Sequence, residues 1–105
     1  MKEDTLFMKF FGNSPIMRVI DFLIDNRLFD YSKTDISKES GVGWATLFKI
    51  WPTLEQSVIV IKTRRIGRAN LYKLNMESPI VQELIRFDRT LTRIQCTKES
   101  DKIPA

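Results

Sequence analysis

The stretch 32–74 constrains the fold of this 105-residue chain more than any other part of the sequence. Ser32 is a helix N-cap residue with Asp35 three positions on, which is a typical helix start. Gly41 is expected to end that helix after about two turns, because glycine readily adopts the left-handed conformation of a helix C-terminus. A second helix is predicted to begin at Trp44, so the segment indicates a helix-turn-helix unit.

The second helix of this unit carries apolar residues at helical spacing, and Leu47 and Trp51 belong to its expected inward face. Ile36 of the first helix is expected to contact Leu47 and lock the two helices together. Pro52 costs about 3 kcal/mol inside a helix. We therefore expect the second helix to span residues 44–51 and to end at the proline.

A hairpin with a basic turn is predicted to follow. The runs Val58–Ile61 and Leu71–Leu74 are strand-like, and Gly67 supplies the positive φ that a tight turn needs. From Lys62 to Lys73 the chain carries five cations and no acidic residue. A solubilising surface usually mixes both signs of charge, so this segment favours an anionic partner.

Two further helices are predicted on either side of this stretch. The pairs Ser14-Pro15 and Ser78-Pro79 each place a capping serine before a proline, which is a typical helix start. The first helix is expected to fade near Asn26, and the other is expected to span residues 78–95. The C-terminal helix carries an apolar seam with heptad-type spacing. The seam residues are Ile80, Leu84, Phe87, Leu91 and Ile94.

These elements predict one domain, residues 1–96, followed by a flexible polar tail, residues 97–105. The apolar segment 6–11 is too short to assign by periodicity, and we expect a short strand or turn there. The predicted fold class is mostly α with a small β-hairpin. It is a winged helix-turn-helix with a three-helix core, a wing and a long C-terminal helix.

The residue inventory argues against an enzyme. The chain has no histidine, which removes the usual general base and zinc ligand, and its single cysteine, Cys96, excludes an internal disulfide. The sequence shows no phosphate-binding glycine loop and no metal-ligand cluster, so we expect no cofactor and no metal. Arg18, Asp21 and Asp25 interrupt the most apolar stretch, which argues against a membrane span. A charged N-terminus without a signal-peptide pattern predicts a cytoplasmic, nucleoid-associated protein.

The outward residues of the helix-turn-helix unit and the cations of the hairpin together predict a surface for double-stranded DNA. In such proteins the second helix presents its N-terminal face to base edges in the major groove. A basic hairpin gains from counterion release on the backbone and fits a narrow minor groove. The expected function is sequence-specific transcription regulation. The candidate DNA-binding residues are Lys33, Trp44, Ala45, Thr46, Phe48, Lys49, Lys62, Arg64, Arg65 and Arg68.

Two alternatives to this function stay open. A protein-docking winged helix would use Trp44 and Phe48 as apolar anchors, because aromatic residues are favoured in interface hot spots. A non-specific chromatin or plasmid-partition protein would bind DNA without sequence preference. The C-terminal seam also has two interpretations, since it can fold back onto the first helix or pair with a second copy. Its length favours a homodimer, which predicts a palindromic DNA site.

Two runs of the chain resemble archaeal winged-helix transcription regulators, broadly of the MarR, ArsR and TrmB kind. The run Tyr31–Val42 resembles the opening of their helix-turn-helix, and Thr63–Leu74 is similar to their basic wing. The resemblance covers residues 14–94 and implies a dimeric regulator whose third helix reads the major groove. The chain departs from these proteins at Gly43, where they often have a serine cap, and at Pro52, which shortens the reading helix.

Overall fold

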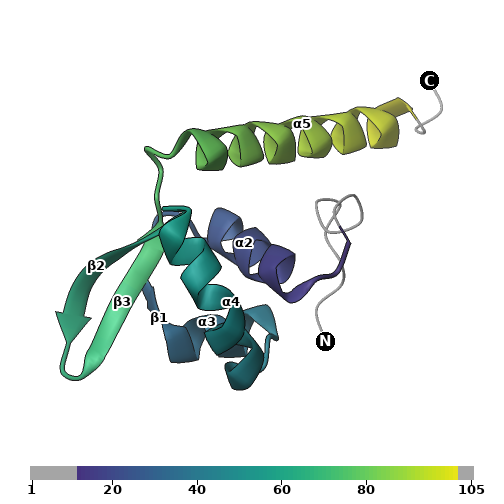
Figure 1. Cartoon of the computed structure of the whole chain (residues 1–105). Coiled ribbons are helices and arrows are strands. Elements are labelled where there is room, and N and C mark those ends of the chain that lie inside the picture. The colour runs from purple at the N-terminus through teal and green to yellow at the C-terminus, as the bar shows by residue number, and fades with distance from the viewer. Residues whose placement is uncertain (1–11, 102–105) are drawn as a thin grey trace.

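Four helices and one antiparallel sheet make up the described part of this computed structural model, residues 12–101, with side chains described to residue 96 (Figure 1). The helices are α2 (Pro15–Asp25), α3 (Lys33–Ser40), α4 (Trp44–Gln56) and α5 (Pro79–Asp101). The strands are β1 (Tyr31–Ser32), β2 (Val60–Ile66) and β3 (Ala69–Leu74), in the spatial order β1-β3-β2. The predicted helices and hairpin are therefore present. The apolar segment 6–11 lies outside the described residues.

The helix starts follow the local signals in the sequence. Ser14 caps α2 by accepting a hydrogen bond from the backbone N–H of Met17. Ser32 caps α3 in the same way, and its Oγ lies 3.1 Å from the backbone nitrogen of Asp35. Each cap satisfies one of the four backbone N–H groups that a helix start leaves free.

The core lies between α2, α3, α4 and the sheet. Ile36 and Leu47 are buried there, as expected for the contact between α3 and α4, and Val42 is buried beside them in the same core. Trp51 and Leu54 of α4 are buried as well. Burying one such side chain contributes roughly 1.5–3 kcal/mol, so this interlock holds α4 against the body of the domain.

Helix α4 does not end at Pro52, and the expected end at residue 51 is wrong. The helix continues through the proline to Gln56. Pro52 itself lies on the exposed side of the helix, where solvent can hydrate the carbonyl group that loses its N–H partner. Trp51 and Leu54 on the opposite side are buried, and their burial offsets the roughly 3 kcal/mol cost of an interior proline.

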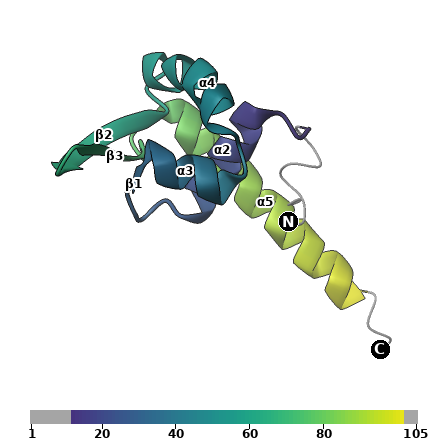
Figure 2. The same cartoon turned by 90° about the horizontal axis from the view of Figure 1, so that it is seen from below.

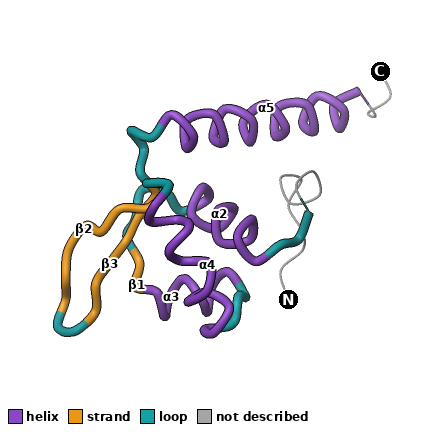
Figure 3. Tube along the Cα trace, in the orientation of Figure 1, coloured by secondary structure: helices purple, strands orange, loops and turns teal. Residues whose placement is uncertain are grey.

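The hairpin is longer and its turn is tighter than the sequence indicates. Strand β2 begins at Val60 and runs to Ile66, leaving only Gly67 and Arg68 in the turn. Gly67 has a φ of +61°, as predicted for this position. Val58 has a φ of +54° and lies before the strand, so the expected strand start at residue 58 is wrong. The tube in Figure 3 shows the turn at the far end of the hairpin from the helices.

The short strand β1 was not expected from the sequence. Tyr31 pairs with Tyr72, and Ser32 pairs with Leu71, so β1 lies beside β3 and not beside β2. Because Ser32 also caps α3, this pairing joins the residue that precedes that helix directly to the sheet. The position of α3 relative to the hairpin is therefore fixed by backbone hydrogen bonds.

Helix α5 begins as predicted but extends past the expected end at residue 95 to Asp101, into the segment expected to be a tail. Of the five seam residues, Leu84 and Phe87 pack partly buried against the core of the same chain, whereas Ile80 and Ile94 are exposed and Leu91 is buried. The seam thus folds back onto the core at Leu84 and Phe87, and not at its first residue, Ile80. Figure 2 shows the C-terminal part of α5 projecting past α2, α3 and α4. Pairing with a second copy stays a prediction.

Gly41 is expected to be sensitive to substitution. It ends α3 with a φ of +73°. A non-glycine residue pays about 1–2 kcal/mol in this conformation, whereas asparagine tolerates it. Gly41→Ala should therefore lower the free energy of unfolding by about 1 kcal/mol in urea denaturation, and Gly41→Asn by clearly less. Both variants place a Cβ 2.6 Å from Nη2 of Arg18, a flexible group. If both variants lost the same free energy of unfolding, the contact with Arg18, and not the backbone conformation, would determine the loss.

Candidate nucleic-acid interface

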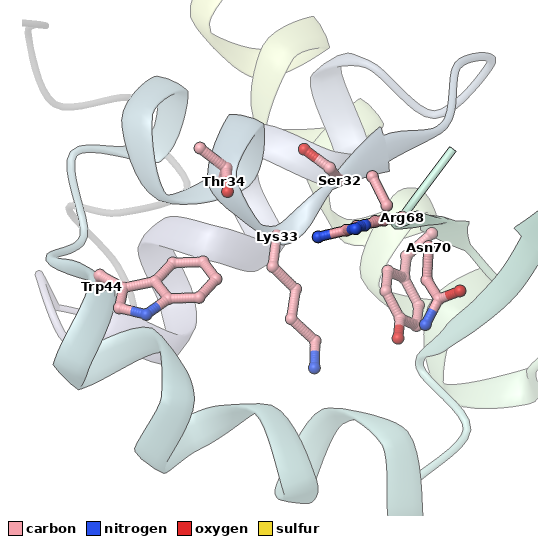
Figure 4. Close-up of a pocket in the computed structure, with 8 residues that line it drawn as sticks. Ser32, Lys33, Thr34, Trp44, Arg68 and Asn70 are labelled. Atoms are coloured by element: carbon pink, nitrogen blue, oxygen red, sulfur yellow. The ribbon is translucent and has the colours of Figure 1, made fainter. Parts of the chain in front are cut away.

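A groove of about 340 Å³ opens between the start of α3, the start of α4 and the β2–β3 hairpin (Figure 4). We refer to it as the α3–hairpin groove. It is lined by Ser32, Lys33 and Thr34 at the start of α3, by Trp44 of α4, and by Arg68, Ala69, Asn70 and Tyr72 of the hairpin. Two of these residues are cationic and none is acidic, so the groove attracts anions.

Lys33 projects into the groove between Trp44 and Arg68 (Figure 4). Its Nζ lies 5.3 Å from the ring centroid of Trp51 and 5.5 Å from that of Tyr72, within the range of a cation–π interaction. Within residues 12–96, neither Lys33 nor Arg68 takes part in an ion pair. The ammonium group is thus held in place by aromatic rings while its charge stays uncompensated.

The register of the hairpin decides which of its other cations face the groove. In an antiparallel pair, directly opposed residues project to the same face. Lys62 lies opposite Tyr72, and Arg65 lies opposite Asn70, so both point to the side that carries the groove. A bulge between Lys62 and Arg64 shifts the alternation by one residue. Without this bulge, Lys62 and Arg65 would point to opposite faces.

Arg64 lies on the other side of the hairpin and is paired with Asp30. Its Nε and Nη2 donate hydrogen bonds to the carboxylate oxygens of Asp30 at 2.9 and 3.2 Å. The Oγ1 of Thr63 also donates to Asp30, at 2.6 Å. The hydrogen bonds from Arg64 and then Thr63 lower the pKa of Asp30. The basic segment 62–73 therefore contains no acidic residue, but the fold places Asp30 beside it. Arg64 is paired with Asp30 and is not brought into the groove.

The outer face of α4 carries the residues that the sequence predicts to face outward. Trp44 and Phe48 are 47% and 58% exposed, and their ring centroids lie 5.4 Å apart. Ala45 and Lys49 are exposed, and Thr46 is half-buried. Contact between these side chains and DNA stays a prediction.

Sequence reasoning did not identify Asn70, Tyr72 and Asp30 as residues of this region. Asn70 and Tyr72 lie in β3 and line the groove. The two-residue spacing of Asn70 and Tyr72 in a strand is a signal that places both on one face. Asp30 carried no such signal, because its partner Arg64 lies 34 residues further along the chain.

Replacing Asp30 tests whether this carboxylate neutralises Arg64. Because its pKa is lowered in the folded state, the ion pair stabilises the hairpin at neutral pH, and this contribution is lost as the pH falls through the lowered pKa. Asp30→Asn should therefore lower the urea midpoint of unfolding at pH 7 and change it little at a pH below the lowered pKa of Asp30, where the carboxyl group of the unmodified protein is also uncharged. Because Arg64 lies outside the groove, neither Asp30→Asn nor Arg64→Ala should alter the salt dependence of binding to duplex DNA. An equal loss of stability at both pH values would contradict this assignment.

Comparison of the sequence with known protein families and with curated proteins finds no match. Across residues 12–96, no three histidine, cysteine or acidic side chains lie close enough together to hold a metal ion. None of the helices described here is both long and apolar enough to cross a lipid bilayer.

Proposed function

We propose that the chain is a sequence-specific regulator that binds double-stranded DNA through a winged-helix arrangement. Helices α2, α3 and α4 form its helical core and the β2–β3 hairpin is its wing. One observation carries the proposal: Lys33 of α3 and Arg68 of the hairpin, distant in sequence, lie in one groove with the exposed Trp44 of α4 and no acidic lining residue. A duplex presents two rows of phosphates, which such a surface matches in charge.

The cations on this side of the domain set the expected strength of the electrostatic contribution. Lys33, Lys62, Arg65 and Arg68 belong to the groove or to the face that carries it. Each neutralised phosphate adds about 0.9 to the negative slope of log K against log salt concentration. Four contacts per protomer therefore predict a slope of roughly −3 to −4 for one bound copy.

Sequence discrimination is assigned to the first turns of α4, which enter the major groove in the proposed complex. Ala45 can contact a thymine methyl group, and Thr46 can contact that group or donate a hydrogen bond to a base. Lys49 can reach a guanine edge or a phosphate. Replacing Thr46 or Lys49 should therefore weaken the preferred site more than unrelated DNA.

We assign dimerisation to α5, whose exposed apolar residues Ile80 and Ile94 are available to a second copy. A two-fold dimer would place two reading helices about one helical turn of DNA apart. The preferred site would then be palindromic, and the protein would reside on the nucleoid.

A second candidate function is favoured by the aromatic pair on α4. Trp44 and Phe48 are both about half-exposed and contact each other, which is the composition of a protein-docking hot spot. Such a module would bind its partner through apolar contacts, and its affinity would depend little on salt.

Salt titration of duplex binding separates the two functions. Fluorescence anisotropy with a labelled duplex is measured between about 50 and 200 mM salt, a range over which phosphate contacts weaken steeply. A steep loss of affinity, with competition favouring one DNA sequence over unrelated duplex, supports the proposed regulator. Absence of binding at the lowest salt concentration would refute it, and equal competition by all sequences would refute sequence-specific regulation.

A further inference from the structure

Trp44 offers a flat apolar surface at the edge of the α3–hairpin groove. Its indole is 47% exposed, and its only described ring contact is with Phe48, at 5.4 Å between centroids. In a duplex the faces of the bases are covered by their neighbours, so an approaching indole meets only base edges and backbone. An unpaired base has a free face, on which an aromatic side chain stacks without regard to sequence.

The cations of the groove lie where such a nucleotide would carry its phosphate. Lys33 is drawn between Trp44 and Arg68 in Figure 4, and all three line the groove. The Nζ of Lys33 also lies 5.6 Å from the ring centroid of Phe48, so the aromatic pair and the ammonium are adjacent. Because neither cation is in an ion pair within residues 12–96, both can pair with one phosphodiester.

Asn70 adds a group able to recognise a base edge. Its side chain lines the same groove and has no hydrogen-bond partner among residues 12–96. A side-chain amide offers two donors and one acceptor, which match the edge of an unpaired base. The groove volume of about 340 Å³ lies at the lower end of the range of about 300–1,000 Å³ for sites that hold small organic groups.

Resting on the DNA binding proposed above, we infer that the α3–hairpin groove holds one unpaired nucleotide of a DNA strand. The base stacks on Trp44, its phosphate lies between Lys33 and Arg68, and its edge meets Asn70. The protein therefore prefers DNA that carries an extrahelical or single-stranded nucleotide over a perfect duplex of the same sequence.

The test compares a perfect duplex with the same duplex carrying one extra unpaired nucleotide in one strand. Anisotropy titrations should give about 10-fold tighter binding to the bulged DNA, within the effect of stacking one base. Intrinsic fluorescence gives a second readout, since Trp44 is exposed and Trp51 is buried. Quenching of Trp44 should be larger with the bulged DNA than with the duplex.

Variants at Trp44 separate stacking from a structural role. Trp44→Leu should reduce the ratio of the two affinities from about 10 to about 1, whereas Trp44→Phe, which keeps a stacking ring, should retain most of it. A ratio that survives in Trp44→Leu would overturn the inference, because the preference would then arise elsewhere.

The outcomes also distinguish this inference from the proposed function. Equal affinity for bulged and perfect DNA would overturn the nucleotide site and leave duplex binding intact. Failure to bind either DNA would overturn the proposed function and the site together. If free nucleoside monophosphate quenches Trp44 and displaces both DNAs equally, the groove is a small-ligand site and the inference is wrong.

Discussion

Replacing Lys33 and Arg68 together by alanine is expected to weaken binding to duplex DNA by about 50-fold near 0.1 M salt, on the counterion-release estimate for two phosphate contacts. Both side chains line the α3–hairpin groove, and neither is neutralised by an ion pair within residues 12–96. The slope of log K against log salt concentration should fall by about two units, and the loss should be similar for all sequences. Anisotropy titrations at several salt concentrations measure both quantities.

A matched control removes the same charge from another side of the molecule. Arg89 and Arg93 are exposed on α5, which Figure 1 shows on the far side of α2 from α3. The double replacement Arg89→Ala with Arg93→Ala changes the net charge equally but should leave the slope within about half a unit of the unmodified protein. Equal losses in the two double variants would mean that net charge, and not the groove, governs binding.

Replacing Trp51 is expected to have the largest effect on stability. The side chain is 1% exposed and meets Tyr72 edge-on, with ring centroids 4.9 Å apart. Trp51→Ala should lower the free energy of unfolding by about 3–5 kcal/mol, a large part of the total stability of a small domain. The same change removes one of the three rings around Lys33. Urea denaturation followed by circular dichroism measures the loss.

Trp51→Phe is the conservative counterpart and stays measurable if the alanine variant does not fold. Phenylalanine keeps an aromatic ring in the core and removes an indole N–H that is buried without a partner in the described residues. Leaving such a donor unpaired costs about 1–3 kcal/mol, and its removal offsets part of the lost packing. We expect a net loss below about 1.5 kcal/mol. A loss as large as that of alanine would show that the ring itself is not what stabilises this site.

Local signals in the sequence were sufficient for most of the helical framework. The capping serine Ser32 and the terminal glycine Gly41 fix both ends of α3, because caps act within a few residues of the chain. Helical spacing likewise identified Ile36 and Leu47 as core residues. Helix caps and helical spacing both depend on interactions between residues that are close together in the chain. The sequence of a short segment is therefore enough to identify them.

Features that depend on tertiary contacts could not be derived in this way. The free-energy cost of Pro52 inside α4 can be read from the local sequence. The burial of Trp51 and Leu54, which offsets this cost, depends on contacts with other elements of the fold. The pairing of Arg64 with Asp30 joins strand β2 to the segment before β1, and only the folded sheet brings these two together. A bulge in β2 then decides which cations face the groove, and no residue type in that run marks its position.

Titration of ¹⁵N-labelled protein with a duplex of its preferred sequence shows which residues contact the DNA. We expect the backbone amide signals of Lys33, Trp44 and Arg68 to shift or broaden together at low salt. The signals of exposed residues of α5, such as Arg86 and Arg89, should stay unchanged. Shifts confined to α5, or the absence of any shift at low salt, would contradict the claim that the α3–hairpin groove and the start of α4 form one surface for DNA.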